Sequence, residues 1–170
     1  MTFGTVSRAL SLALPLVTAA VPTAVSTLRN AEGQEVGKAT LSSTKGGVKV
    51  HVEVANLAPG KHGIHLHAAG KCEAPDFKSA GGHFNPAEKH HGLHNPAGAH
   101  AGDLPNLVVG KDGKAKATFT AKGATLGEGK GSLLGPDGSA LVIHADPDDE
   151  KTDPAGNSGA RIACGVVEKK

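Results

Sequence analysis

The sequence predicts an all-β fold, an eight-stranded antiparallel Greek-key barrel or sandwich that carries two long functional loops. Three observations support this prediction. About eight short runs alternate apolar and polar residues, turn signals separate them, and no convincing helical pattern is present. The 170 residues suit one domain, and 24 Gly and 10 Pro supply many turns. With four Phe, no Trp and no Tyr, the core must consist of Val, Leu, Ile and Ala.

Four strands are expected in the first half of the domain. They are predicted at residues 26–30, 35–41, 48–54 and 63–67, with turns at 31–33, 45–47 and 56–60. Residues 48–54 alternate strictly and give the clearest strand pattern. His51 lies on its polar face beside Lys49 and Glu53. We therefore expect His51 to face solvent rather than bind a metal.

The second half predicts two hairpins and a last strand. Residues 107–109 and 114–120 flank a turn at Asp112-Gly113, residues 132–134 and 140–145 flank a turn at 135–138, and the last strand covers 160–167. Residues 68–104 and 146–158 show almost no periodicity. Because long irregular segments are uncommon in compact domains unless they are functional, these two are the predicted functional loops.

Residues 1–24 have the features of a secretory signal peptide. Arg8 precedes a nearly apolar run over 9–21, and no acidic residue occurs before Glu32. The run is too short for a membrane span, so we expect no membrane span in the mature chain. Cleavage points are offered at Ala19, Ala20 and Ala24. The prediction is an exported domain at 25–170, periplasmic or extracellular; the alternative is a buried first helix or strand.

Export determines how the two cysteines are interpreted. In an oxidising compartment, Cys72 and Cys164 favour a structural disulfide over a redox pair. Two separate free thiols are the alternative.

The charges nearly cancel, with 18 Lys and Arg against 16 Asp and Glu. This balance argues against a nucleic-acid-binding stripe and against an acidic tail. Any electrostatic function must therefore be local.

Histidine is unusually frequent, with 10 residues. In a strand over 63–67, His65 and His67 point to one face, while Ile64 and Leu66 point to the other. Further histidines occupy or flank the two loops, and Asp103 follows the last histidine of the first loop by three residues. Imidazole is a good ligand for zinc and copper, so the set predicts a metal site. Its members are His65, His67, His83, His90, His91, His94, His100 and His144.

Six segments resemble those of the copper,zinc superoxide dismutases, particularly the secreted bacterial branch. The likeness runs from about residue 26 to 167, and the motifs agree in order and spacing. They are GIHLH (63–67), SAGGHFNP (79–86), KHHG (89–92), HAGDLPN (100–106), LVIHADPDD (141–149) and GNSGARIACG (156–165).

The resemblance implies two adjoining metal sites. Copper is expected on His65, His67, His83 and His144. Zinc is expected on His83, His91, His100 and Asp103, with His83 bridging the two metals as an imidazolate. A zinc site with four protein ligands is typical of a structural metal.

The resemblance also implies different roles for residues that are close together in the sequence. It favours His91 over His90, because the family's zinc ligand is the histidine immediately before glycine. It gives His94 no role beyond the loop, and it likens His62 to a histidine that hydrogen-bonds the backbone. Asp148 matches a carboxylate that orients His65 and His91; the alternative is a solvated loop acid.

Arg161 is expected to attract and place the anionic substrate by charge and hydrogen bonds, rather than form a surface ion pair. Lys89 and Lys151 are candidates for long-range attraction. Arg161 and His83 are thus the predicted catalytic residues.

The implied activity is disproportionation of superoxide, a small anion, to oxygen and hydrogen peroxide by a copper redox cycle. The alternative is a protein that binds or delivers copper and zinc without catalysis. A purely structural sandwich leaves the histidines unexplained, and a copper-only relative is disfavoured because His91, His100 and Asp103 are present. The resemblance allows a homodimer without requiring one.

Overall fold

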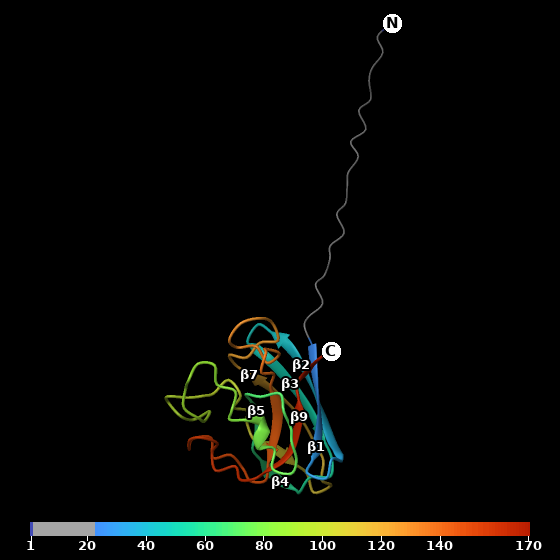
Figure 1. The fold of residues 1–170 in the computed structure, drawn as a ribbon, viewed down its shortest axis with the longest axis vertical. Coiled ribbons are helices and arrows are strands. Elements are labelled where there is room, and N and C mark those ends of the chain that lie inside the picture. The colour runs from blue at the N-terminus through green and yellow to red at the C-terminus, as the bar shows by residue number, and fades with distance from the viewer. Residues whose placement is uncertain (2–22) are drawn as a thin grey trace.

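The computed structural model describes Met1 and residues 23–170, so most of the predicted signal peptide lies outside the described residues. The described chain forms strands joined by turns and loops, with a single 3-10 turn, η1 (Lys78–Ala80), and no α-helix (Figure 1). The strands are β1 (Thr23–Asn30), β2 (Glu35–Thr44), β3 (Gly47–Val54), β4 (Gly60–His62), β5 (Ile64–His67), β6 (Leu107–Val109), β7 (Ala115–Ala121), β8 (Ala140–His144), β9 (Arg161–Val166) and β10 (Glu168–Lys169).

All strand pairs are antiparallel. The main sheet has eight strands, with the path β5-β8-β9-β1-β2-β3-β7 and β10 paired to β1, while β4 and β6 form a separate two-stranded sheet. Two pairs of neighbours in this path are far apart in sequence, because β5 pairs with β8 and β9 pairs with β1. The predicted all-β fold class is confirmed.

Two predicted hairpins are wrong. A turn does form at Asp112-Gly113, where the Gly110 N–H donates to the Lys114 carbonyl over 2.8 Å. The strands that it joins then diverge, because β6 pairs with β4 while β7 pairs with β3. Residues 132–134 form no strand and make only an isolated bridge from Ser132 to Thr125. Turn chemistry predicted the chain reversals, but distant partners decided the pairing.

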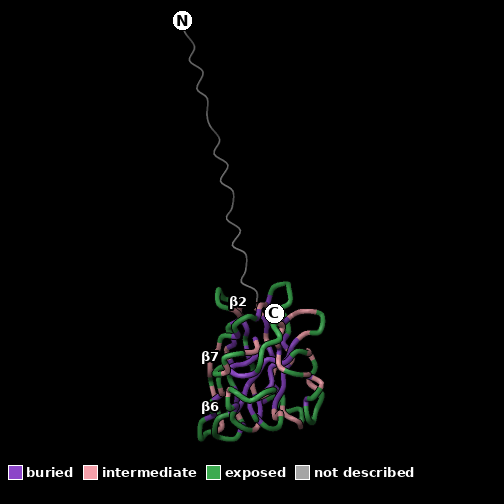
Figure 2. The backbone as a smooth tube through the Cα atoms, turned by 90° about the vertical axis from the view of Figure 1, so that its left-hand side faces the viewer, coloured by how far each residue is buried: buried purple, intermediate pink, exposed green. Residues whose placement is uncertain are grey.

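The core is built from the inward faces of the sheet. On β3, the alternation seen in the sequence buries Val48, Val50 and Val52 completely. Each such valine contributes roughly 1.5–3 kcal/mol through the hydrophobic effect. Buried backbone runs through the strands, and exposed backbone concentrates in the turns and loops (Figure 2). A firm barrel wall therefore supports the loops.

The two predicted loops are irregular apart from η1, and they project from the same side of the sheet in Figure 1, coloured green to yellow and red. Hydrogen bonds join residues 90–95 of the first loop to residues 148–153 of the second. The His94 N–H donates to the Glu150 carbonyl over 3.1 Å, and the Asn95 side-chain amide donates to the Lys151 carbonyl over 3.4 Å. No helix among the described residues has the length and hydropathy to cross a membrane.

Candidate metal centre

Strands β5 and β8 place three of the predicted copper ligands. They pair from Ile64 with Ile143 to His67 with Ala140, and both are buried along their whole length. His65 and His67 lie two positions apart on β5, with ring centroids 6.3 Å apart. His144 ends β8 at an irregularity in the β8–β9 register, and its ring lies 4.9 Å from that of His65.

His83 comes to these three residues from the first long loop. An isolated bridge pairs it with His67, and its ring centroid lies 4.1 Å from that of His65. One ligand atom from each of the four histidines lies within 4.8 Å of the others. The structure therefore brings together the whole predicted copper set.

The four histidines of this group each direct one nitrogen to no protein partner. Six buried side-chain polar atoms in the described chain lack a hydrogen bond, and four of them are His65 Nδ1, His67 Nε2, His83 Nε2 and His144 Nε2. Because an unpaired buried polar atom costs about 1–3 kcal/mol, four in one place require an explanation. Metal coordination supplies it, and the donor set fits copper.

The second nitrogen of each ligand ring fixes its orientation. The His65 Nε2–H donates to Asp148 Oδ2 over 2.7 Å, and the His67 Nδ1–H donates to the Gly81 carbonyl over 2.9 Å. The His144 Nδ1–H donates to the Gly159 carbonyl over 3.3 Å. These partners hold the tautomers that leave the inward nitrogens free to bind a metal.

The predicted zinc set forms a second group that shares His83. The Nδ1 atoms of its three histidines surround Asp103 Oδ1, at 2.9 Å for His83, 3.1 Å for His91 and 3.2 Å for His100. One ligand atom from each of the four residues lies within 4.8 Å of the others. Three imidazoles and one carboxylate fit a closed zinc site.

Burial and charge act differently on the two groups. Burial, together with the neighbouring His83, lowers the pKa of His67 to about 2, and burial with His65 lowers the pKa of His144 to about 3. Burial also lowers the pKa of His83 to about 4, despite Asp103. Burial also disfavours the charged form of His91, but its ring N–H groups donate to the carboxylates of Asp103 and Asp148, and these contacts raise its pKa to about 9. At neutral pH, His67, His83 and His144 are thus neutral in the metal-free chain, whereas His91 is charged.

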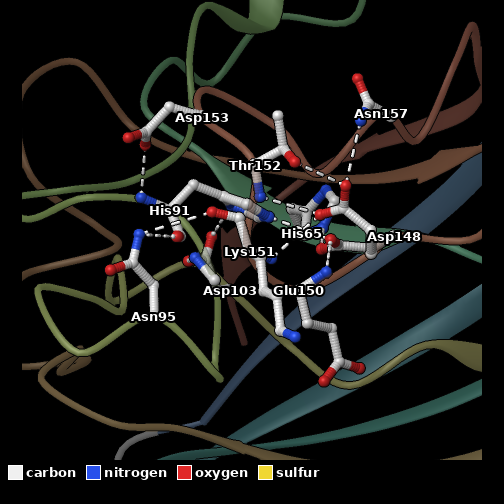
Figure 3. Close-up of polar contacts among 12 residues, drawn as sticks. His65, His91, Asn95, Asp103, Asp148, Glu150, Lys151, Thr152, Asp153 and Asn157 are labelled. Carbon is white, nitrogen blue, oxygen red and sulfur yellow. Dashed lines mark hydrogen bonds and ion pairs between the residues drawn. The ribbon is translucent and has the colours of Figure 1, made fainter.

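Asp148 connects the two groups as predicted. Its Oδ2 accepts from His65, and its Oδ1 accepts from His91 Nε2 over 3.0 Å. Figure 3 shows Asp148 beside His65, with His91 reaching toward Asp148 on one side and Asp103 on the other. The Asp148 side chain is 1% exposed, so it is not a solvated loop acid.

Arg161 begins β9 and is half-buried beside the copper group. Its Nη1 donates to the Phe77 carbonyl and its Nη2 to the Gly81 carbonyl, each over 2.7 Å. It forms no ion pair in the described chain, so the surface ion-pair alternative is not supported. The Gly81 carbonyl also accepts from His67, and it therefore connects Arg161 with a copper-group ligand.

The remaining histidines occupy supporting positions. His62 is buried and hydrogen-bonds the carbonyls of His144 and Ala58, each over 2.8 Å, as the resemblance implied. His90 and His94 are exposed and pair with Asp153 and Glu150. His51 is only partly exposed, and it contacts Thr118 and Glu53 on the outer face of the sheet rather than a metal group.

Three contributors were not singled out from the sequence. The carbonyls of Phe77 and Gly81 hold Arg161, and Asp153 accepts the His91 backbone N–H over 2.6 Å. A main-chain carbonyl leaves no signal in a sequence. The sequence signal for Asp153 was weak, because this residue is one of several acidic residues in the second loop.

Cys72 and Cys164 form the predicted disulfide, with a sequence separation of 92 and a Cα–Cα distance of 5.6 Å. The bond joins the first loop to β9, three residues beyond Arg161. No free cysteine is present in the described residues.

Comparison with known proteins agrees with this geometry. The model of a family described as copper/zinc superoxide dismutase (SODC) matches residues 35–167. "Superoxide dismutase [Cu-Zn] 1" of Aquifex aeolicus is 51% identical over 141 residues, covering 82% of this chain and 83% of that protein. The crystal structure of a SOD-like protein from Bacillus subtilis is 46% identical with a TM-score of 0.81, and the match covers 84% of this chain and 96% of that chain. Cu/Zn superoxide dismutase from Brucella abortus is 33% identical with a TM-score of 0.69, and the match covers 86% of this chain and 99% of that chain.

An all-β barrel with two adjoining four-donor groups that share one histidine defines a class of two-metal protein. The chain belongs to the copper/zinc superoxide dismutase family. It is an enzyme that disproportionates superoxide and uses copper and zinc as cofactors.

Proposed function

We propose that His65, His67, His83 and His144 hold the copper ion of this enzyme and that His83, His91, His100 and Asp103 hold the zinc ion. The four unpartnered buried nitrogens of the first group are the observation that carries the proposal. Bound copper supplies reversible one-electron transfer, and zinc supplies a fixed positive charge.

His83 has the position of a proton carrier between the groups. Its side chain is 3% exposed, its Nδ1 faces Asp103, and its Nε2 faces the copper group. Two superoxide ions and two protons yield one oxygen and one hydrogen peroxide. We assign to His83 Nε2 one of those protons, taken up in the first half of the cycle and given up in the second.

Arg161 is proposed to bind the substrate. Two carbonyl acceptors fix the guanidinium plane beside the copper group, and its remaining N–H donors are free to hold a small anion. Lys89 and Lys151 are exposed on the two loops, where their charges attract anions over a longer range.

The test is the rate of superoxide loss with the copper- and zinc-loaded protein. Arg161→Ala should retain both metals yet lower the rate about tenfold or more, since electrostatic steering raises on-rates by 10–10³. The wild-type rate should also fall as salt rises. Arg29→Ala is the matched control, because Arg29 pairs with Glu35 at the surface. An unchanged rate in Arg161→Ala would refute its role, and tight metal binding without turnover in the wild type would favour the metal-carrier alternative.

We also propose export, with a leader that lies within the predicted residues 1–24 and a mature domain in the periplasm or outside the cell. Ala24 is fully buried and pairs with Leu41 and Lys169. These contacts favour cleavage at Ala19 or Ala20 over Ala24, which would remove two residues of β1. Intact-mass measurement of the secreted protein checks this, and a mature chain starting at Val25 would contradict it. The homodimer stays a prediction, tested by analytical ultracentrifugation.

A further inference from the structure

Asp148 orients both metal groups, yet it lies in a loop without regular structure. Both of its carboxylate oxygens are in use, because Oδ2 accepts from His65 while Oδ1 accepts from His91 and from the Glu150 N–H. A shift of its backbone by about 1 Å is enough to break such contacts. Something must therefore fix the backbone of residue 148.

The side chain of Asn106 makes that contact. Its Oδ1 accepts the Asp148 N–H over 2.8 Å, and its Nδ2–H donates to the Asp148 carbonyl over 2.8 Å. The same Nδ2 lies 3.4 Å from Glu150 Oε1. A carboxamide carries one acceptor and two donors, so it can satisfy both backbone groups of one residue as a neighbouring strand does.

Asn106 is itself on a firm support. It follows the zinc-group residue Asp103 by three positions and directly precedes β6, whose Leu107 pairs with His62. Leu104 and Leu107 on either side of it are fully buried in the core. The Asn106 amide therefore connects the barrel wall to Asp148, the loop residue that orients the ligands.

We propose that Asn106 is a positioning residue, which acts through Asp148 to hold the rings of His65 and His91 and so couples the two metal groups. This inference rests on the proposed function. Aspartate in its place would keep the acceptor but lose the donor, and it would set a carboxylate against the Asp148 carbonyl and Glu150.

The matched control is Asn85. Its side chain makes the same double contact with one backbone unit, accepting the Lys89 N–H over 3.0 Å and donating to the Lys89 carbonyl over 2.8 Å. Lys89 orients no ligand. Asn106→Ala and Asn85→Ala each remove a pair of hydrogen bonds to one backbone unit of a loop, and only the first should disturb the ligand rings.

Two readouts other than activity test the inference. In zinc-loaded protein, Asn106→Ala should weaken zinc affinity about 10- to 100-fold by chelator competition, the usual effect of losing an outer partner of a ligand. The NMR signals of the His65 and His91 Nε2–H protons should exchange with water at least about tenfold faster. Asn85→Ala should leave both readouts unchanged. If Asn106→Ala does not fold, Asn106→Asp carries the same test.

A double-mutant cycle separates positioning from general stability. In an Asp148→Ala background, Asn106→Ala should add little further loss of zinc affinity, because its effect passes through Asp148. Additive losses, or equal losses in Asn85→Ala, would overturn the inference. An unchanged zinc affinity in Asp103→Ala, which removes a proposed ligand, would instead refute the proposed zinc site, so the two failures are distinguishable.

Discussion

Each histidine of the copper group has two different nitrogens, and the partner of one determines what the other can do. His65 gives its Nε2–H to Asp148 and keeps Nδ1 free, whereas His67 gives its Nδ1–H to Gly81 and keeps Nε2 free. The residue type alone does not decide which nitrogen binds. The tautomer depends on contacts with residues 14 and 83 positions away in sequence.

Acid should destabilise the metal-free protein through these same residues. Their folded pKa values, about 2 for His67, about 4 for His83 and about 3 for His144, lie below the ordinary 6.5. The stability they contribute is therefore complete above about pH 6.5 and is lost as the pH falls toward their folded values. His91, with a folded pKa of about 9, has the opposite sign, and its contribution is lost as the pH rises through 9.

Urea unfolding of the metal-free protein across pH measures this. Near pH 5 unfolding should take up as many as about three protons, and stability should also decline as the pH rises from about 6.5 to 9. His144→Gln should reduce the uptake near pH 5 by about one proton. Proton uptake that is the same in wild type and variant would contradict this explanation.

At the scale of elements, the site joins one rigid part to two irregular ones. The β5–β8 ladder supplies His65, His67 and His144, and the first loop supplies His83, His91, His100 and Asp103. The second loop supplies Asp148, whose carboxylate contacts a residue from each of the other two parts. Because the loops have few ladder bonds of their own, the contacts between them determine how well the ligands are placed.

Gly92 allows the two loops to approach. Its φ is +110°, and a Cβ there would overlap the Glu150 carbonyl. Gly92→Ala should therefore separate the loops and weaken zinc binding. Backbone strain at this φ should also lower the free energy of unfolding by about 1–3 kcal/mol. Gly33→Ala is the control, since φ is +78° and nothing lies within 4 Å, so only backbone strain is added. Chelator competition and urea unfolding measure both, and equal zinc affinity in the two variants would contradict the prediction.

At the scale of the whole molecule, the disulfide connects the first loop to the barrel. Cys72 lies at the start of the segment whose Phe77 and Gly81 carbonyls hold Arg161, and Cys164 lies on the strand that Arg161 begins. The bond thereby restrains both the guanidinium and its acceptors. Loop closure over 92 residues also restricts the unfolded chain.

Replacing both cysteines by serine should lower the free energy of unfolding by roughly 4–5 kcal/mol in the chain-entropy model. The rate with superoxide should fall more than the metal content does, because Arg161 loses a fixed position. Thermal unfolding, metal analysis and the rate measure these effects. A variant that retains the full rate per copper ion would show that the bond does not support Arg161.

Most of the strands, the turns, the two long loops and the disulfide were predicted from the sequence, although residues 132–134 form no strand. The residues that the structure gathers in the two metal groups were also among those predicted. Strand alternation is local, and the spacing of the histidine motifs resembles one family closely. Strand pairing was predicted less well. Residues 107–109 and 114–120 meet at a turn but pair with β4 and β3, because burial of their apolar faces outweighs the local hairpin preference.

Only the tertiary structure decided which atoms act. The unpartnered nitrogens, the two carbonyls that hold Arg161 and the amide of Asn106 on the Asp148 backbone all depend on contacts between segments far apart in sequence. The side-chain type that a site requires is a property of the sequence. The direction in which each donor points is set by packing, because a hydrogen bond requires its partner within about 3 Å and in line.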